Sequence, residues 1–177
     1  MVLLFIDIFI FMKTDREYTI YVDLDGVIAD FHTEFKKLSG GFTPDEFILK
    51  HSKNKFWDLI DGAGEDFWSD MPLLPGAIEL MNFIKNNFID IKILTASTRK
   101  PESKSGKRKW VRKHFPFISD IDVIVVEERA MKTQYANNKS ILIDDMVGNI
   151  ERWKSNNGVG ILYTSTNAAI KKLIQYV

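Results

Sequence analysis

Two charged residues interrupt an apolar segment near the start of the chain, in the sequence YVDLDGVIADF. The preceding residues are typical of a buried β-strand, but Asp23 and Asp25 place two carboxylates two positions apart. Side chains with this spacing lie on the same face of a strand, where their negative charges repel each other. We therefore expect a positively charged partner between them, and Gly26 permits a sharp turn directly afterwards.

Short apolar runs of this kind predict five strands, at residues 18–25, 90–97, 122–128, 140–145 and 158–165. Segments with helical periodicity alternate with them, and the clearest are 76–88, 105–115 and 167–177. In the first of these helices we expect Ile78, Leu80 and Ile84 on the buried face. Strands that alternate with helices predict an α/β fold, with a mainly parallel, Rossmann-like sheet as the middle of three layers.

One segment after the first strand breaks this alternation. Residues 32–71 contain helix-like and aromatic stretches but no convincing buried strand, and roughly 40 residues is too long for an ordinary connection. We expect them to form a small helical cap over the carboxyl ends of the strands. Residues 12–31 and 72–177 would then form the α/β core.

The N-terminal residues 1–11 are strongly apolar, but they contain Asp7 and lack both a basic start and a small-residue cleavage site. The segment is also too short to span a bilayer as a helix, so a signal peptide and a membrane anchor are poor interpretations. We interpret it as an extension or an extra strand. The 177 residues include no cysteine, which excludes disulfides and thiolate chemistry and is compatible with a cytoplasmic location.

The formal net charge is zero but unevenly distributed, because residues 99–113 hold eight Lys or Arg residues and one Glu. We interpret this run as a solvated helix face that raises the local potential for an anionic substrate. Nucleic-acid binding is the alternative, but basic and aromatic residues do not alternate in the run and the rest of the chain is acidic. We expect neither a nucleic-acid nor a membrane partner, and we leave a homodimer open.

Polar residues follow or end three of the predicted strands, where open α/β sheets bind their ligands. They are Asp23 and Asp25, then Thr95 and Ser97, then Asp144 and Asp145. Carboxylates from two strands, with no Cys or His beside them, suit Mg²⁺; without a cation, at least one would have a raised pKa. An acidic metal site with a basic rim suits a phosphate ester, and Asp is a competent nucleophile towards phosphorus.

The motifs DLDGVIADF, ILTAS and ILIDD, in this order and each after an apolar run, resemble motifs I, II and IV of the haloacid dehalogenase-like superfamily of phosphotransferases. More narrowly, residues 18–165 resemble the 5'(3')-deoxyribonucleotidases, the cytosolic type C nucleotidases. The resemblance implies a Mg²⁺-dependent phosphomonoesterase of the 5'-nucleotidase type. Its substrates would be deoxynucleoside monophosphates, dephosphorylated through an aspartyl-phosphate.

The same resemblance implies roles for the motif residues. Asp23 would be the nucleophile, and Asp25 would protonate the leaving nucleoside oxygen and then activate the hydrolytic water. Mg²⁺ would be held by the side chains of Asp23 and Asp145 and the backbone carbonyl of Asp25, with Asp144 supporting from beside it. Thr95 matches the motif II hydroxyl.

The phosphate-binding lysine has two candidates. Lys132 in MKT fits the motif order better, and Lys107 in GKRKW is the other; either could instead be an ordinary solvated lysine. Ala96 and Ser97 depart from the family pattern after Thr95, so the remaining phosphate contacts stay open.

The nucleoside is expected under the cap, against Phe31, Phe56, Trp57 and Trp68. The other interpretation of these aromatic residues is a small hydrophobic core within the cap. Asn149 either braces the metal site or caps the helix that follows, and we favour the cap.

Two alternatives to a deoxynucleotidase stay open. The chain could be a phosphatase for sugar phosphates or polynucleotide ends, or a non-catalytic nucleotide-binding relative. The presence of Asp23, Asp25, Thr95, Asp145 and a lysine together argues against the non-catalytic relative, because a decayed site usually lacks at least one of them.

Overall fold

The computed structural model describes residues 18–98 and 100–177, so the expectations for residues 1–11 lie outside the described residues. Five strands form one sheet in the order β3-β2-β1-β4-β5, and each neighbouring pair is parallel. The strands are β1 (Thr19–Val22), β2 (Asp90–Ala96), β3 (Val123–Val126), β4 (Ser140–Asp144) and β5 (Val159–Leu162). Each falls within a predicted apolar run, so the predicted strands and their parallel arrangement are confirmed.

The strand β1 occupies the centre of the sheet, with Ile20 opposite Ile91 of β2 and Ile141 of β4. It ends at Val22, three residues before the end of the predicted strand. Asp25 instead lies in a turn that an isolated bridge to Ala29 closes. The expectation that Asp23 and Asp25 share one face of a strand is therefore wrong, because strand alternation does not continue to Asp25.

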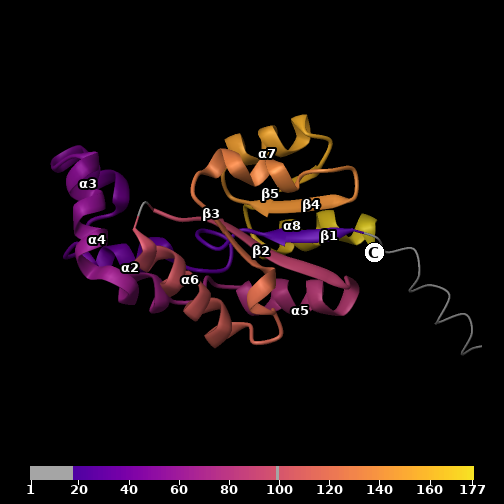
Figure 1. Ribbon diagram of the computed structural model, residues 1–177, viewed down its shortest axis with the longest axis horizontal. Helices are drawn as coiled ribbons and strands as arrows, with labels where there is room; N and C mark the ends of the chain where they lie inside the picture. The colour runs from indigo at the N-terminus through magenta and orange to yellow at the C-terminus, as the bar shows by residue number, and fades with distance from the viewer. Residues whose placement is uncertain (1–17, 99) are drawn as a thin grey trace, which may run out of the picture.

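Helices cover both faces of the sheet (Figure 1), which confirms the three-layer α/β fold. One face carries α5 (Ala77–Asn87), α6 (Pro101–His114) and α8 (Thr166–Leu173), followed by the short 3-10 helix η3 (Ile174–Tyr176). The other carries α7 (Val147–Ser155) and the 3-10 helix η2 (Arg129–Tyr135). The remaining 3-10 helix, η1 (Asp120–Asp122), precedes β3.

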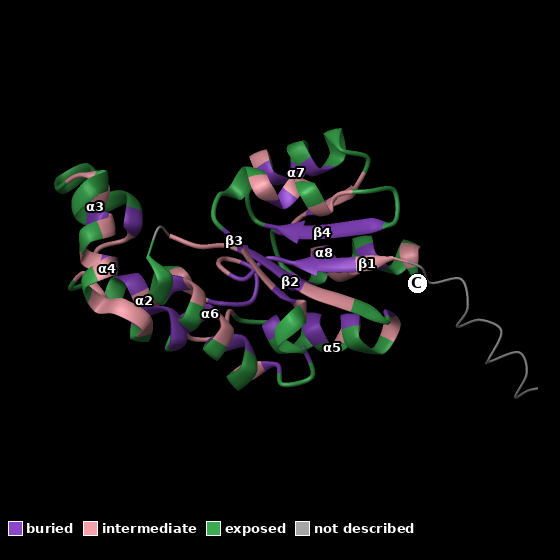
Figure 2. Cartoon of the chain, viewed as in Figure 1, coloured by how far each residue is buried: buried purple, intermediate pink, exposed green. Residues whose placement is uncertain are grey.

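Each face of the sheet has its own hydrophobic core, because alternate strand residues point in opposite directions. Val22 packs into the core under α5, α6 and α8, whereas Tyr21 and Trp153 pack under α7. Figure 2 shows the central strands β1 and β4 as mostly buried. We expected Ile78 on the buried face of α5, but its side chain is 48% exposed. The face of α5 that meets the core is formed instead by Ala77, Leu80, Met81 and Ile84.

Three helices inserted between β1 and α5 lie beyond the carboxyl ends of the strands, at the left of Figure 1. We call α2 (Phe31–Leu38), α3 (Pro44–Lys50) and α4 (Lys53–Ser69) the cap helices. Side-chain caps start them: Asp30 accepts from the Thr33 amide before α2, and Thr43 and Glu46 form a capping box on α3. The division into a cap at 32–71 and a core around it stays a prediction. No described helix is long and apolar enough to cross a bilayer.

Candidate active site

The carboxyl edge of the sheet gathers the polar motif residues. Asp23 follows β1, Thr95 lies near the end of β2, and Asp144 ends β4. Because these strands are parallel neighbours, their ends meet at one edge. Lys132 reaches this edge from η2 and Lys107 reaches it from α6, so that both candidate lysines lie in the site.

Three carboxylates form the acidic centre of the site. One oxygen each from Asp23, Asp144 and Asp145 lie within 4.8 Å of one another. Lys132 binds two of the three, with its Nζ 2.9 Å from Asp23 Oδ1 and 2.7 Å from Asp144 Oδ2. Burial by itself lowers the pKa of Lys132, but the two adjacent carboxylates outweigh it and raise the pKa above its usual value. The lysine therefore stays charged and offsets part of the repulsion expected from the sequence.

Asp144 is fully engaged by protein donors. In addition to Lys132, it accepts hydrogen bonds from Asn149 Nδ2, at 3.0 and 2.9 Å to its two oxygens, and from the Met146 amide at 2.8 Å. The helix α7 begins at Val147 with Met146 as its N-cap, so the interpretation of Asn149 as the helix cap is wrong. Asn149 is buried and braces Asp144 instead. Its position four residues after Asp145, in the first turn of a helix that starts at the site, is the sequence signal for this role.

Asp145 differs sharply from its neighbour. Among the described residues it forms no ion pair, and its carboxylate lies against Gly26. A Cβ at Gly26 would lie 2.4 Å from Asp145 Oδ2, and the Gly26 backbone has a φ of +77°. Asp145 as a residue is exposed, but the surrounding chain partly desolvates its carboxylate. This desolvation, followed by the charges of Asp23 and Asp144, raises the pKa of Asp145 to about 7. The surplus negative charge makes Asp145 the carboxylate best placed to bind a cation.

Asp25 is paired with the second lysine. Lys107 is 1% exposed, and its Nζ lies 2.5 Å from Asp25 Oδ2, 3.0 Å from Thr95 Oγ1 and 2.7 Å from the Ala96 carbonyl oxygen. Burial raises the pKa of Asp25, and the Lys107 ammonium opposes only part of this shift. Asp25 Oδ1 is enclosed and has no hydrogen-bond partner among the described residues.

The end of β2 adds two hydroxyl groups. Thr95 is 1% exposed, and its Oγ1 accepts a hydrogen bond from the Lys107 ammonium. Ser97 follows the strand, and its Oγ is buried without a hydrogen-bond partner among the described residues. Its backbone is held by a 2.8 Å hydrogen bond from its amide to the Val126 carbonyl. Ser97 therefore offers a fixed, unused hydroxyl beside Thr95.

The four aromatic residues expected to contact a nucleoside divide into two pairs. Phe56 and Trp68 are 5% and 3% exposed and pack in the hydrophobic core, so this conformation contradicts their assignment as substrate contacts. Phe31 and Trp57 are half-buried and keep free surface. The Phe31 ring is stacked on Phe35 with centroids 6.3 Å apart. The interpretation of these aromatic residues as a hydrophobic core thus holds for Phe56 and Trp68.

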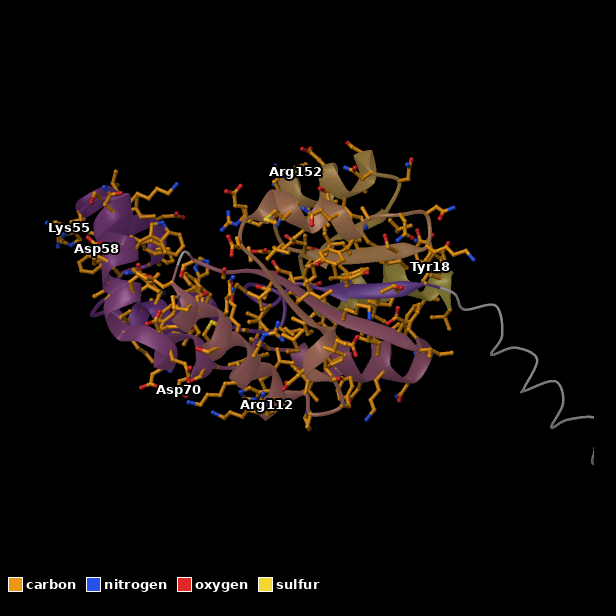
Figure 3. All side chains as sticks on the ribbon, in the orientation of Figure 1. Tyr18, Lys55, Asp58, Asp70, Arg112 and Arg152 are labelled. Carbon is orange, nitrogen blue, oxygen red and sulfur yellow. The ribbon has the colours of Figure 1, made fainter. Side chains whose placement is uncertain are left out.

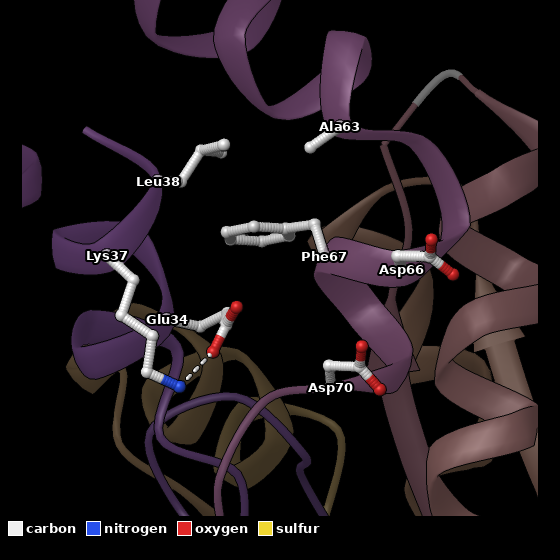
Figure 4. A pocket seen from close by; sticks show the side chains of 7 residues that line it. All are labelled: Glu34, Lys37, Leu38, Ala63, Asp66, Phe67 and Asp70. Carbon is white, nitrogen blue, oxygen red and sulfur yellow. Dashed lines mark hydrogen bonds and ion pairs between the residues drawn. The ribbon is translucent and has the colours of Figure 1, made fainter. Parts of the chain in front are cut away.

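A hollow between the cap helices is separate from this site. It has a volume of about 310 Å³ and lies between α2 and α4 (Figure 4). Its walls include the ion pair between Lys37 and Glu34, the apolar Phe67 and the carboxylates of Asp66 and Asp70. None of the predicted site residues lines it.

The basic run on α6 is largely paired with acidic side chains. Lys104 contacts Glu127 at 2.9 Å, Lys109 contacts Glu65 at 3.3 Å, and Arg112, at the outside of α6 in Figure 3, contacts Asp120 at 2.7 Å. Lys107 turns inwards to the site. These contacts leave less free positive charge on this face than the sequence suggests, which weakens the nucleic-acid alternative.

Comparison with protein families gives one match that spans nearly the whole described chain. Residues 17–174 match the family described as 5' nucleotidase, deoxy (pyrimidine), cytosolic type C protein. A 5'(3')-deoxyribonucleotidase of Bacillus subtilis is 22% identical over 154 residues, which cover 81% of this chain and 83% of that protein. The mitochondrial 5'(3')-deoxyribonucleotidase of Mus musculus is 29% identical over 120 residues, covering 58% of this chain and 54% of that protein.

Solved structures show the same fold at low sequence identity. A hydrolase from Streptococcus pneumoniae superposes with a TM-score of 0.56 at 16% identity, covering 89% of this chain and 99% of that one. A haloacid dehalogenase-like hydrolase from Bacillus subtilis, solved bound to magnesium, gives a TM-score of 0.55 at 15% identity, covering 89% and 97%. These likenesses confirm the haloacid dehalogenase-like fold.

Proposed function

Since the chain belongs to the 5' nucleotidase, deoxy (pyrimidine), cytosolic type C family and is a phosphoric monoester hydrolase, we propose that it dephosphorylates deoxynucleoside monophosphates. One observation carries the proposal: a lysine-anchored carboxylate, Asp23, lies beside an unpaired carboxylate, Asp145, and a third carboxyl group, Asp25. This arrangement supplies a nucleophile, a cation site and a proton donor at one edge of the sheet.

Asp23 is the proposed nucleophile. Its Oδ1 accepts hydrogen bonds from the Leu24 amide at 2.8 Å and from Lys132 at 2.9 Å. These contacts fix the carboxylate and leave Oδ2 for attack on phosphorus. In the first step a bond forms between Asp23 Oδ2 and phosphorus, and the bond from phosphorus to the nucleoside oxygen breaks.

Asp25 is the proposed acid and base. Its raised pKa favours the protonated form, and its Oδ1, which has no hydrogen-bond partner among the described residues, would donate that proton to the leaving nucleoside oxygen. In the second step Asp25 accepts a proton from water as the water oxygen attacks phosphorus. The bond between Asp23 and phosphorus then breaks, and inorganic phosphate leaves.

The acidic centre fits Mg²⁺. Its donors are carboxylate oxygens, which are the ligands that Mg²⁺ prefers, and Asp145 lacks a compensating cation among the described residues. Asp23, Asp145 and the backbone carbonyl of Asp25 would hold the ion. Asp144 would act beside it through its bonds to Lys132 and Asn149. When bound, Mg²⁺ would neutralise charge on the phosphate oxygens.

Lys132, Thr95 and Ser97 would bind the phosphate, and the Ala96 backbone would lie beside it. Phe31 and Trp57, which keep free surface, are the proposed contacts to base and sugar. In this proposal residues 32–71 act as a cap over the core, and the cytoplasm is the proposed location.

A substrate panel tests the proposed specificity. Deoxynucleoside monophosphates, sugar phosphates and phosphorylated oligonucleotides are assayed with Mg²⁺ at equal concentrations, and kcat/KM is compared. Deoxynucleoside monophosphates should be turned over best. Higher kcat/KM for sugar phosphates or for oligonucleotide ends would overturn the proposed substrate class.

A single substitution tests the nucleophile. Asp23→Asn should lower kcat on an aryl phosphate by on the order of 10⁴-fold, because the amide cannot form the phosphoenzyme. Asp120→Asn, on an exposed residue paired with Arg112, is the matched control and should leave kcat unchanged. Undiminished hydrolysis by Asp23→Asn would show that Asp23 is not the nucleophile.

A further inference from the structure

The ammonium group of Lys107 is closed on every side. Its three N–H groups reach three acceptors: Asp25 Oδ2, Thr95 Oγ1 and the Ala96 carbonyl. Its remaining side faces the ring of Trp68, whose centroid lies 4.7 Å from Nζ. Lysines rarely become 99% buried without such complete pairing.

The backbone of α6 is shaped to bring Trp68 to this position. A Cβ at Gly106 would lie 2.6 Å from both Trp68 Cβ and the Glu65 carbonyl oxygen, so only glycine permits this approach of α4 to α6. Two further contacts, one before Trp68 in the chain and one after it, hold the end of α4 against α6. Lys109 pairs with Glu65 at 3.3 Å, and Trp110 Nε1 donates to the Met71 carbonyl at 2.6 Å.

We propose that Trp68 is a positioning residue, whose ring holds the Lys107 ammonium against Asp25 and Thr95 and so links the cap helices to the proton-transfer group. Trp68 was expected to stack on the substrate, but its ring is 3% exposed and already covers Lys107. The inference rests on the proposed function, because it takes Asp25 as the acid and base.

Lys107 needs such a contact to stay in place, because a lysine side chain has four rotatable bonds and a strongly hydrated ammonium group. Without the ring, water would enter beside Nζ and the side chain would gain other rotamers. Lys107 would then spend less time on Asp25, and the carboxyl group would lose its fixed orientation. A desolvated cation–π contact of this kind corresponds to about 10- to 30-fold in a rate that depends on that orientation.

Kinetic analysis of three variants tests the proposal on a deoxynucleoside monophosphate and on an aryl phosphate that lacks a nucleoside. Trp68→Leu should lower kcat about 10- to 30-fold on both substrates, with KM changed less than about twofold. Trp68→Phe keeps an aromatic face and should recover kcat to within about threefold of the unmodified protein. Gly106→Ala should lower kcat on both substrates, because its Cβ displaces Trp68.

Phe35→Leu is the matched control, because Phe35 is a 0% exposed aromatic residue of the same cap helices that contacts Phe56 and Phe31 rather than Lys107. It should lower the thermal midpoint as much as Trp68→Leu but leave kcat unchanged. Equal losses of kcat in the two variants would overturn the proposal in favour of a structural role. A rise in KM for the nucleotide alone would overturn it in favour of direct substrate contact.

Chemical labelling separates this inference from the proposed function. An acylating reagent and peptide mapping report the accessibility of Lys107 without any turnover. Lys107 should be protected in the unmodified protein and in Phe35→Leu, and labelled in Trp68→Leu. Protection in Trp68→Leu would overturn the positioning role. If the unmodified protein hydrolyses neither substrate but labelling follows the expected pattern, the proposed function fails while the link between Trp68 and Lys107 stands.

Discussion

The two halves of the candidate active site each contain a buried lysine, but the two lysines have different surroundings. Among the described residues Lys132 pairs with two carboxylates, Asp23 and Asp144. The other hydrogen-bond donors to these carboxylates lie outside the cap helices: Leu24, Met146 and Asn149. Lys107 reaches one carboxylate, Asp25, together with neutral acceptors and the ring of Trp68 from the cap helices. Both lysines were candidates for one role in the sequence, with Lys132 the better fit, but the structure gives them different partners.

The charge balance of the two halves differs in the same way. In the Lys132 half, one ammonium faces the three carboxylates of the acidic centre, and Asp145 is left with a pKa raised to about 7. In the Lys107 half, one ammonium faces one carboxylate. The Lys132 half therefore carries the surplus negative charge that an added cation would neutralise, whereas we expect the Lys107 half to depend on geometry. The predictions below test this difference, from the largest expected effect to the smallest.

Removing each lysine in turn should separate the halves most clearly. Lys132→Met leaves Asp23 and Asp144 buried without their ammonium and should cost about 3–5 kcal/mol of unfolding free energy, with kcat lowered by on the order of 10³-fold. Lys107→Met should cost about 2 kcal/mol, because only one hydrogen-bonded charge loses its partner. Denaturant unfolding and steady-state kinetics measure both. Equal stability losses would show that the two halves are not distinct.

Asp145 should control cation affinity, in contrast to Asp144. Asp145→Asn should weaken Mg²⁺ binding by about 100-fold in calorimetric titration, because it removes the unpaired ligand. Without Mg²⁺ the same variant should be at least as stable as the unmodified protein, since it removes surplus negative charge. Asp144→Asn should instead lower stability, because it disrupts bonds to Lys132 and Asn149. The opposite pattern would assign the metal to Asp144.

Gly26→Ala should weaken the Lys132 half without changing any charge. Its Cβ would push Asp145 aside, and the +77° φ is unfavourable for alanine, so Mg²⁺ affinity should fall about tenfold and stability by about 1–2 kcal/mol. Gly62→Ala is the control, because a Cβ there meets no atom within 4 Å and the residue lies within α4. That variant should keep its Mg²⁺ affinity. Equal Mg²⁺ affinities in the two variants would contradict the close packing of Gly26 on Asp145.

The pH dependence of stability should come from the Lys132 half. Because the pKa of Asp145 is raised from 3.8 to about 7, the folded protein binds a proton that the unfolded chain releases between these values. Stability without Mg²⁺ should therefore fall as the pH rises from about 4 to about 7. Mg²⁺ competes with this proton, so the rise in thermal midpoint on adding Mg²⁺ should be a few degrees larger at pH 8 than at pH 5. Asp145→Asn should remove most of this difference.

The strands and the motif residues were predictable because their signals are local. A buried parallel strand reads as a short apolar run, and all five runs became strands. The site positions Asp23, Asp25, Thr95 and Asp145 lie towards the carboxyl ends of these runs, so the parallel topology is sufficient to bring them to one edge. The role of each residue is still a proposal, because it rests on the resemblance and on geometry.

The errors arose where the outcome depended on distant contacts. Asn149 follows a helix start in sequence, but its partner is Asp144 rather than the helix backbone. Ile78 fits an apolar periodicity, but the neighbouring face of α5 is the one that meets the sheet. Phe56 and Trp68 looked like aromatic residues for a flat ligand, but they pack in the protein core.

The amino-acid sequence alone determined an α/β sheet with acidic residues at its carboxyl edge. Strands and helices follow from the pattern of apolar and polar residues over short segments, so this part of the fold is encoded locally. Only the tertiary structure decided what lies between the two aspartates of YVDLDGVIADF. Asp23 turns to Lys132 and Asp25 turns to Lys107, which is 82 positions away in the chain. The sequence of the basic run is equally compatible with an exposed Lys107. Gly106 and Trp68 enclose it next to Asp25, and no local pattern encodes the approach of two helices.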